Sequence, residues 1–275
     1  MILTDDQSWV GTSFLADPED PRSKSDYYQT PNMERLAKNG MRMINGYAPA
    51  PFCSPTRKSI LTGLTPAKHE YQKDRDNWTK AFRKQMTIPK ILKKADPNYV
   101  TAHFGKWDAR YDDFTPEEMG YDFSDGLTSN NTGGGKKTLH NNGVDFPFEM
   151  GNAWPKAYDD PKLIFSLTQR SNDFMEEQTK SNKPFFIQIS HYAVHLAITY
   201  SQKNINKYSK SEKGQKHFVP EFAAMTEDMD DGIGLILDKV SELGIADNTY
   251  IIFLSDNGGR TSIPIGPKQK VARNF

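Results

Sequence analysis

The sequence has little cysteine, no excess of either charge and no long hydrophobic run. Cys53 is the only cysteine among 275 residues, so no disulfide can form within the chain. Lysine and arginine together number 35, as do aspartate and glutamate, and the formal net charge is zero. Such a chain lacks the broad positive field that attracts nucleic acids or anionic membranes, and no apolar run approaches the roughly 20 residues of a membrane span. We therefore expect no nucleic-acid partner and no membrane span.

Apolar runs alternate with helical patterns along the chain. Four runs predict strands, at residues 2–3, 99–104, 185–189 and 250–254. The last, TYIIFL, is continuous, as expected in the centre of a parallel sheet. The alternation predicts an α/β fold with a mostly parallel central sheet and helices on both faces. Functional groups in such folds gather beyond the carboxyl ends of the strands.

The helical patterns carry start and stop signals. Thr30 is expected to cap a helix that has Pro31 at its first position and ends at Gly40. A second helix is expected to open at Pro55 and to close near Gly63.

Two longer helices are predicted further along. One covers residues 160–180 and is capped by Asp160. The clearest covers residues 222–243, where apolar side chains recur at spacings of three and four and form one apolar face. Residues 123–143 and 201–217 are rich in small polar residues or lysine, and we expect both to be irregular loops.

Oxygen-donating side chains follow the first and last predicted strands. Asp5 and Asp6 come after one, and Asp256 and Asn257 after the other. Three carboxylates and an amide oxygen suit a hard cation such as Ca²⁺ or Mg²⁺. The plainer interpretation is that they are loop and cap residues, because Asp and Asn are favoured there in any case.

The stretch PFCSPTRKSILTG places the single cysteine at the expected start of a helix. The free N–H groups and the dipole at that helix end favour an anion, and Arg57 lies one turn on with a fork that suits a tetrahedral oxyanion. The alternative is a small buried thiol, Cys53, beside a surface arginine.

Several segments together resemble a known family. CSPTRKSILTG is similar to the signature of the type I sulfatases, which depend on formylglycine and belong to the alkaline-phosphatase-like superfamily. Further segments resemble the family in the same order: ILTDDQSW, TPNMERLAKNGMRMINGYA, TAHFGKW, HYAVH and GIADNTYIIFLSDNGG. The resemblance implies that residues 1–275 are an arylsulfatase-like N-terminal catalytic domain, without the start of its first strand and without a C-terminal domain.

The resemblance also implies a metal site and a modified residue. Asp5, Asp6, Asp256 and Asn257 match the family's Ca²⁺ ligands, with Mg²⁺ as the alternative ion. Cys53 matches the cysteine that a formylglycine-generating enzyme converts to an aldehyde, and this residue also faces the metal.

The catalytic roles implied by the family follow. The hydrated aldehyde at Cys53 presents two hydroxyls: one attacks sulfur, and the other then expels sulfate. Arg57 would hold the modified residue, Lys106 would contact sulfate oxygens, and His195 would bind or protonate the leaving group. The implied substrate is a sulfate monoester of an aryl compound or a carbohydrate.

The chain departs from the family pattern at two points. Asp108 stands where the motif Gly-Lys-Trp-His has a histidine, and we include Asp108 among the candidate catalytic residues. A further family lysine is expected after SDNGG, but Lys268 and Lys270 lie too close to that segment.

These departures leave two alternatives to a sulfatase. One is a phosphonate or phosphodiester hydrolase of the same superfamily, and the other is a shortened family member without catalytic activity. The chain itself predicts no location. The resemblance implies a secreted, periplasmic or lysosomal protein whose signal peptide would lie outside this sequence.

Overall fold

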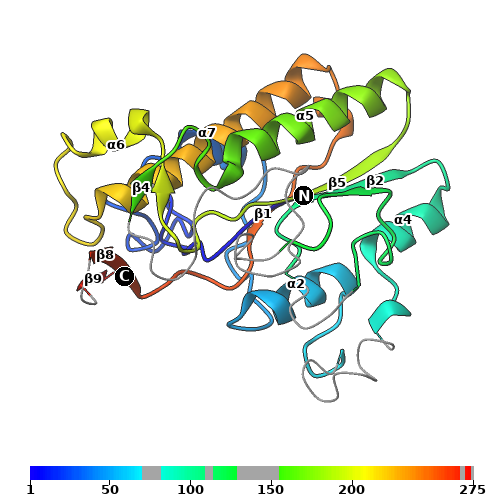
Figure 1. Cartoon of the computed structure of the whole chain (residues 1–275), viewed down its shortest axis with the longest axis horizontal. Coiled ribbons are helices and arrows are strands. Elements are labelled where there is room, and N and C mark those ends of the chain that lie inside the picture. Colours follow the sequence, from blue (N-terminus) through cyan, green and yellow to red (C-terminus); the bar gives the residue numbers. More distant parts are fainter. Residues whose placement is uncertain (70–81, 109–113, 129–154, 267–269, 274–275) are drawn as a thin grey trace.

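The computed structural model describes residues 1–69, 82–108, 114–128, 155–266 and 270–273. Five strands form the central sheet in the order β3-β2-β5-β1-β7 (Figure 1). Their bounds are Phe123–Ser124 for β3, Val100–Gly105 for β2, Phe185–Ser190 for β5, Ile2–Thr4 for β1 and Phe253–Ser255 for β7. All adjacent pairs are parallel, so the carboxyl ends of the strands share one edge. The predicted α/β class and the mostly parallel sheet are confirmed.

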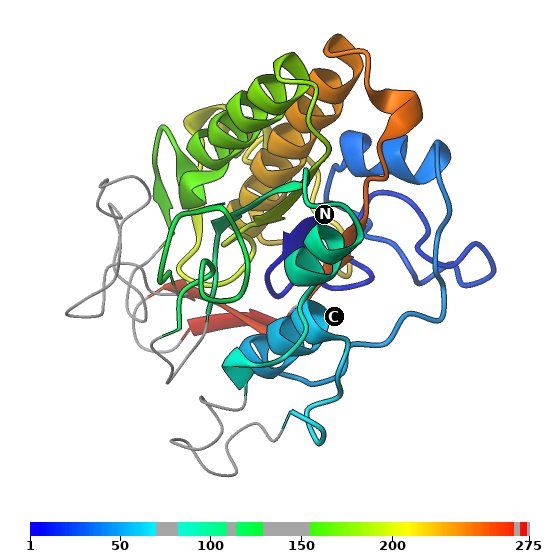
Figure 2. The same ribbon diagram turned by 90° about the vertical axis from the view of Figure 1, so that its right-hand side faces the viewer.

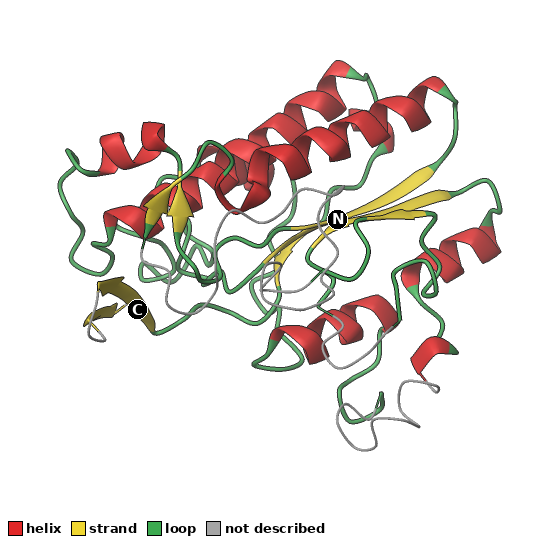
Figure 3. Ribbon diagram, viewed as in Figure 1, coloured by secondary structure: helices red, strands yellow, loops and turns green. Residues whose placement is uncertain are grey.

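Helices cover both faces of this sheet (Figures 2 and 3). On one face lie α5 (Ile164–Lys180) and α7 (Pro220–Glu242), with α1 (Pro31–Lys38) packed against α7. On the other face lie α2 (Cys53–Thr62) and α4 (Ile88–Ala95). Among the described residues, no helix is long and apolar enough to cross a bilayer.

Helix α7 supplies much of the central core, as its periodicity predicts. The side chains of its apolar stripe are buried: Phe222, Met225, Met229, Ile233, Ile236 and Val240. The two long helices approach closely at Gly232, where an added Cβ would stand 2.6 Å from Cγ2 of Ile164. A larger residue at this position would therefore push α5 away from α7.

The cap of α1 comes from another helix and not from Thr30. The Thr30 hydroxyl accepts a hydrogen bond from the Ser13 amide at 2.8 Å instead. The buried Asp230 of α7 accepts from the amides of Asn32 and Met33 at 2.9 and 2.8 Å. The prediction of the helix was right, but its cap is a tertiary contact that a local signal could not reveal.

The helix predicted over residues 160–180 begins with a break. A 3₁₀ turn, Pro161–Leu163, precedes α5, and Lys162 and Leu163 have φ of +53°, which ends the turn before α5 starts. Asp160 still serves as a cap, because its carboxylate accepts from the amide of Phe165 at 2.8 Å.

The segment 201–217 is not wholly irregular, because it contains α6 (Gln202–Tyr208). Ser201 caps this helix, and Asp228 of α7 accepts from the Ser201 amide at 2.7 Å. The lysine-rich composition gave no sign of this helix, which depends on its cap and on packing against α7.

In the segment predicted as a loop from residue 123, the first two residues form β3, and residues 129–143 lie outside the described ranges.

The strand predicted over residues 250–254 is shorter and differently placed. Among the described residues, β7 pairs only with β1 and forms an edge of the sheet, not its centre. β7 begins at Phe253, the register partner of Ile2, and Tyr250 is 96% exposed.

Four short strands and a 3₁₀ turn complete the described chain. β4 (Lys156–Ala157) pairs in parallel with β6 (Thr199–Tyr200), and β8 (Ser262–Gly266) pairs with β9 (Lys270–Arg273) in an antiparallel hairpin. A 3₁₀ turn, Ala246–Asn248, joins α7 to β7.

Candidate active site

The four predicted oxygen donors meet because β1 and β7 are neighbours. Thr4 and Ser255 are register partners in the parallel pair, so the residues that follow each strand emerge side by side. One ligand atom from each of Asp5, Asp6, Asp256 and Cys53 lies within 4.8 Å of the others. The structure thus brings together residues about 250 positions apart in the chain.

The donor set has the features of a site for a hard divalent cation. Asn257 donates through Nδ2 to Asp6 Oδ1 at 2.7 Å, and its own Oδ1 is buried without a hydrogen-bond partner. A buried amide oxygen without a partner is costly, and a cation would satisfy it. With three carboxylates beside it, these residues fit Ca²⁺ or Mg²⁺.

Cys53 is the first residue of α2. The helix begins two residues earlier than expected from Pro55, and Gly63, with φ of +70°, ends it as predicted. The Cys53 thiol donates to Asp5 Oδ1 with an Sγ–O distance of 3.3 Å. Burial, and then Asp5, raise the pKa of Cys53, so the unmodified residue is a neutral thiol and a poor nucleophile.

Arg57 links the acidic cluster to the end of β2. Its Nε and Nη2 both donate to Asp256 Oδ2, at 3.1 and 2.9 Å, and its Nη1 donates to the Lys106 carbonyl at 2.8 Å. Burial raises the pKa of Asp256, and Arg57 offsets only part of that effect. The guanidinium is fixed by three hydrogen bonds close to Cys53.

Lys106 follows β2 and is fully buried. Its Nζ lies 2.6 Å from Asp5 Oδ2. Burial is the largest single effect and opposes the charge on both groups, but the neighbouring opposite charges together outweigh it. Lys106 and Arg57 lower the pKa of Asp5, and Asp5 and Asp108 raise that of Lys106. Gly105 sets the turn, with φ of +90°, and an added Cβ there would stand 2.0 Å from the Ser190 carbonyl oxygen.

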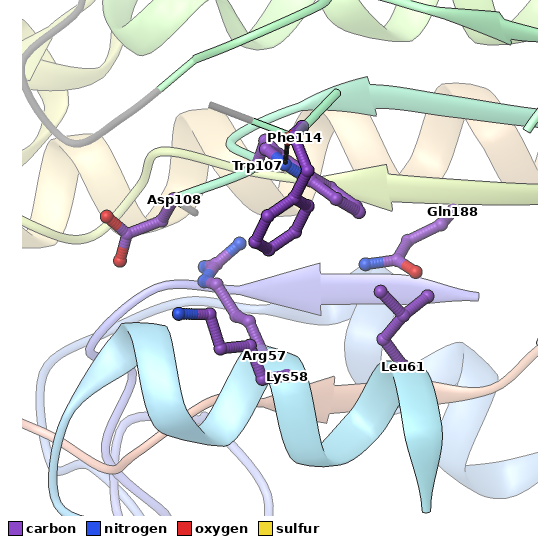
Figure 4. A pocket seen from close by; sticks show the side chains of 7 residues that line it. All are labelled: Arg57, Lys58, Leu61, Trp107, Asp108, Phe114 and Gln188. Atoms are coloured by element: carbon purple, nitrogen blue, oxygen red, sulfur yellow. Dashed lines mark hydrogen bonds between the residues drawn. The ribbon is translucent and has the colours of Figure 1, made fainter. Parts of the chain in front are cut away.

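Asp108, the residue that replaces the family histidine, belongs to the same constellation. Its Oδ2 is 3.8 Å from Lys106 Nζ and has no hydrogen-bond partner. Figure 4 shows Asp108 and Trp107 facing Arg57 and Lys58 of α2 across a small pocket. The carboxylate therefore adds negative charge beside the two cations on which anion binding would depend.

His195 faces the cluster from the segment after β5. Its Nε2 is 3.7 Å from Asp6 Oδ2, and its Nδ1 lies 2.7 Å from the Leu196 carbonyl oxygen, which can only accept. Nδ1 therefore carries the proton, and the neutral ring turns its lone pair at Nε2 toward the site. Burial lowers the pKa of His195, which favours this neutral form.

Lys162 is a buried lysine beside the cluster that the sequence did not reveal. This side chain is only 1% exposed, and its charge interacts with those of Asp5, Asp6 and Lys106. Burial lowers the pKa of Lys162 to about 7. No local signal marks it, because a lysine in a polar turn ordinarily lies in solvent.

Comparison with known proteins shows the family of the chain. The family model described as Sulfatase matches residues 1–271. The chain belongs to the sulfatase family. The resemblance noted from the motifs is thereby confirmed over nearly the whole chain.

Relatives of this sulfatase-family chain include mammalian and bacterial enzymes. Human N-acetylgalactosamine-6-sulfatase is 27% identical over 276 residues, which cover 94% of this chain and 49% of the relative. Ulvan-active sulfatase of Formosa agariphila is 26% identical over 281 residues, with coverage of 94% and 49%. The chain thus spans about half the length of the curated relatives it matches.

Solved structures support the fold. The PsFucS1 sulfatase from Pseudoalteromonas sp. superposes with a TM-score of 0.64 at 22% identity, covering 93% of this chain and 54% of that structure.

The further family lysine expected after SDNGG has no counterpart among the described side chains. Lys268 lies outside the described residues, and so does the side chain of Lys270.

Proposed function

We propose that this chain is the catalytic N-terminal part of a sulfuric ester hydrolase that cleaves sulfate monoesters. The observation that carries the proposal is the position of Cys53: it opens α2 and contacts Asp5 inside a cluster of carboxylates and buried cations. Family membership supports the reaction class.

Asp5, Asp6, Asp256 and Asn257 would hold Ca²⁺, with Mg²⁺ as the alternative, and Cys53 in its modified form would complete the set. The bound ion would supply positive charge that stabilises an oxyanion and lowers the pKa of a nearby hydroxyl. The hard oxygen donors and the unpartnered Asn257 oxygen support this choice over zinc.

The nucleophile would be the hydrate of formylglycine, made from Cys53 by a formylglycine-generating enzyme. One hydroxyl would lose its proton as its oxygen attacks sulfur, and the alcohol would take up a proton as the bond from sulfur to the ester oxygen breaks. The second hydroxyl would then lose its proton as the bond from carbon to the sulfate oxygen breaks, which re-forms the aldehyde and releases sulfate. The raised pKa of the unmodified thiol supports this route, because an unmodified Cys53 would offer little thiolate.

Arg57 and Lys106 would bind the sulfate oxygens and the charge that develops on them. His195 would accept a proton at Nε2, which faces the site, and would then donate it to the ester oxygen of the leaving alcohol. Asp108 would sit beside Lys106 and restrict binding to singly charged groups, because a dianion would be repelled more strongly by this carboxylate.

The proposed substrate class is a sulfated carbohydrate. Two relatives are named for N-acetylgalactosamine-6-sulfate and ulvan, and one structural neighbour is described in complex with its substrate D-glucosamine-2-N,6-O-disulfate. These substrates belong to those proteins, and their shared chemistry, a sulfate on a sugar hydroxyl or amine, supports the class proposed here.

One experiment tests the proposal directly. The chain, and a form extended to the length of its relatives, is produced with a formylglycine-generating enzyme. The Cys53 peptide should lose about 18 Da on conversion, and the converted protein should hydrolyse an aryl sulfate in a Ca²⁺-dependent manner. Cys53→Ala is the control for both readouts. Faster turnover of an aryl phosphodiester would favour the phosphorus-directed alternative, and inactivity after full conversion would favour a non-catalytic family member.

A further inference from the structure

One short loop holds the backbone of the turn that carries Lys106. Residues 125–128, the clasp, accept three amide hydrogen bonds: from Gly105 to Asp125 Oδ2 at 2.8 Å, from Trp107 to Thr128 Oγ1 at 2.9 Å, and from Asp108 to the Thr128 carbonyl at 2.7 Å. The remaining amide of the turn, that of Lys106, donates to the Ser190 carbonyl at 2.8 Å. Every amide from residue 105 to 108 thus has a partner.

The clasp depends on a buried ion pair. The Asp125 side chain has no exposed surface, and its Oδ2 also accepts from Nη2 of Arg170 of α5, at 2.8 Å. The Arg170 side chain is 15% exposed. The Asp125 amide donates to the His103 carbonyl at 3.2 Å, which ties the clasp to β2 as well.

The Asp125–Arg170 ion pair contributes little to the stability of the fold. Asp125 Oδ1 and Arg170 Nε are both buried without hydrogen-bond partners. The ion pair is therefore joined only by the hydrogen bond from Arg170 Nη2 to Asp125 Oδ2. A buried pair with unmet hydrogen-bonding groups recovers little of its desolvation penalty. The geometry of the ion pair is better explained by the backbone turn that it holds in place than by a contribution to the free energy of folding.

What it holds is the turn that places Lys106. Because Gly105 and Trp107 flank Lys106, their hydrogen bonds to the clasp set the direction in which its side chain leaves β2. The lysine carbonyl accepts from Arg57, and Nζ reaches Asp5 Oδ2 at 2.6 Å. Figure 4 shows the neighbouring side chains Trp107 and Asp108 lying over Arg57. A shift of this backbone would move Lys106 and the Arg57 contact together.

We propose that Asp125 and Arg170 are positioning residues for the sulfatase reaction, acting through the clasp to fix Lys106 against the sulfate group. The inference rests on the function proposed above for Lys106. A displacement near 1 Å at such a contact lowers rates by roughly 100-fold, and loss of a supporting hydrogen bond typically lowers activity 10- to 100-fold.

The test is a double-mutant cycle on the converted protein with an aryl sulfate. Asp125→Ala and Arg170→Met should each lower kcat/KM about 10- to 100-fold, and Arg170→Lys should restore part of the loss. In a Lys106→Ala background the same changes should have a clearly smaller effect, because the side chain they position is gone and only the Arg57 contact to the backbone of residue 106 can still be disturbed. Equal losses in both backgrounds, or no loss with either variant, would overturn the proposal.

A matched control separates positioning from stability. Lys239 pairs with Glu176, also on α5, at 2.7 Å, and its side chain is 14% exposed, close to that of Arg170. Lys239→Met should lower the unfolding temperature without lowering kcat/KM more than about twofold. A loss of activity equal to that of Arg170→Met would assign the effect to general loosening of α5.

A second readout needs no turnover. Amide hydrogen exchange at Gly105, Trp107 and Asp108 should accelerate at least 10-fold in Arg170→Met and stay unchanged in Lys239→Met. If the parent protein hydrolyses no sulfate ester, the proposed function fails, and this exchange still decides whether the pair holds the turn. Unchanged exchange in Arg170→Met would overturn the proposal whatever the activity.

Discussion

Single side chains in the cluster have two functions at once, and Arg57 is the clearest case. It neutralises Asp256 and also binds the Lys106 backbone, so its planar fork connects the segments that follow β7 and β2. Asp5 similarly contacts both Cys53 and Lys106. Substitutions that preserve charge but change shape are therefore informative here.

Arg57→Lys should lower the kcat of the converted protein on an aryl sulfate about 100-fold. An ammonium retains the charge but cannot bind Asp256 and the Lys106 carbonyl together. Steady-state kinetics give the comparison, with Arg35→Lys, a partly exposed arginine of α1 paired with Asp238, as the control. Parent-like kcat in Arg57→Lys would remove Arg57 from the catalytic set.

Gly105→Ala should destabilise the protein by more than about 3 kcal/mol or prevent folding. Its positive φ is unfavourable for alanine, and the new Cβ would overlap the Ser190 carbonyl oxygen at 2.0 Å. Gly244→Ala separates these two effects, because Gly244 has φ of +68° and nothing within 4 Å of an added Cβ. Urea unfolding should show a loss near 1 kcal/mol for Gly244→Ala, and equal losses in the two variants would contradict the clash.

At the scale of elements, helices in this fold are completed by residues from other helices. The first amides of α1 donate hydrogen bonds to Asp230 of α7, and the Ser201 cap of α6 donates to Asp228 of the same helix. Two acidic side chains of one long helix thus fix the starts of two shorter ones. This explains why α7 carries the buried carboxylates Asp228 and Asp230.

Asp230→Ala should lower the free energy of unfolding by about 1–3 kcal/mol, because it leaves two helix amides without partners. Asp231→Ala is the matched control, since Asp231 is the next residue, pairs with the exposed Lys203 and otherwise accepts a long hydrogen bond of 3.4 Å from Asn204 Nδ2. That control should change stability by less than about 0.5 kcal/mol. Equal effects in urea denaturation would show that Asp230 does not act as a cap.

At the scale of the whole molecule, acid stability depends on histidines that the fold buries uncharged. Burial lowers the pKa of His103 to about 3 and that of His191 to about 4. Between these values and about 6.5, the unfolded chain binds protons that the folded chain excludes, so each histidine makes stability fall as pH falls. Asp230 acts in the opposite direction, because burial raises its pKa to about 6.

His191→Leu isolates one of these contributions. At pH 7 the variant should be at least as stable as the parent, since both ring nitrogens of His191 are buried without partners. At pH 5 its advantage should grow by about 2 kcal/mol, because leucine removes the proton that only the unfolded chain would bind. Urea unfolding at the two pH values measures this, and parallel pH profiles for parent and variant would contradict it.

Local patterns in the sequence determined the class of fold, the long helix α7, the strands β2 and β5, and the candidate metal ligands together with Cys53 and Arg57. These features depend on neighbours within a few positions: alternation of apolar residues, a proline at a helix start, an aspartate after a strand. The family motifs added roles that no spacing could have supplied, and family membership is now shown.

Only the tertiary structure decided which of these pieces meet. The neighbouring positions of β1 and β7 bring Asp5 to Asp256, and the caps of α1 and α6 come from α7. The burial of Lys162 and the support of Lys106 by Asp125 were equally invisible in the sequence. Each depends on contacts between residues far apart in the chain. Such contacts follow from how the layers pack, and local periodicity carries no information about them.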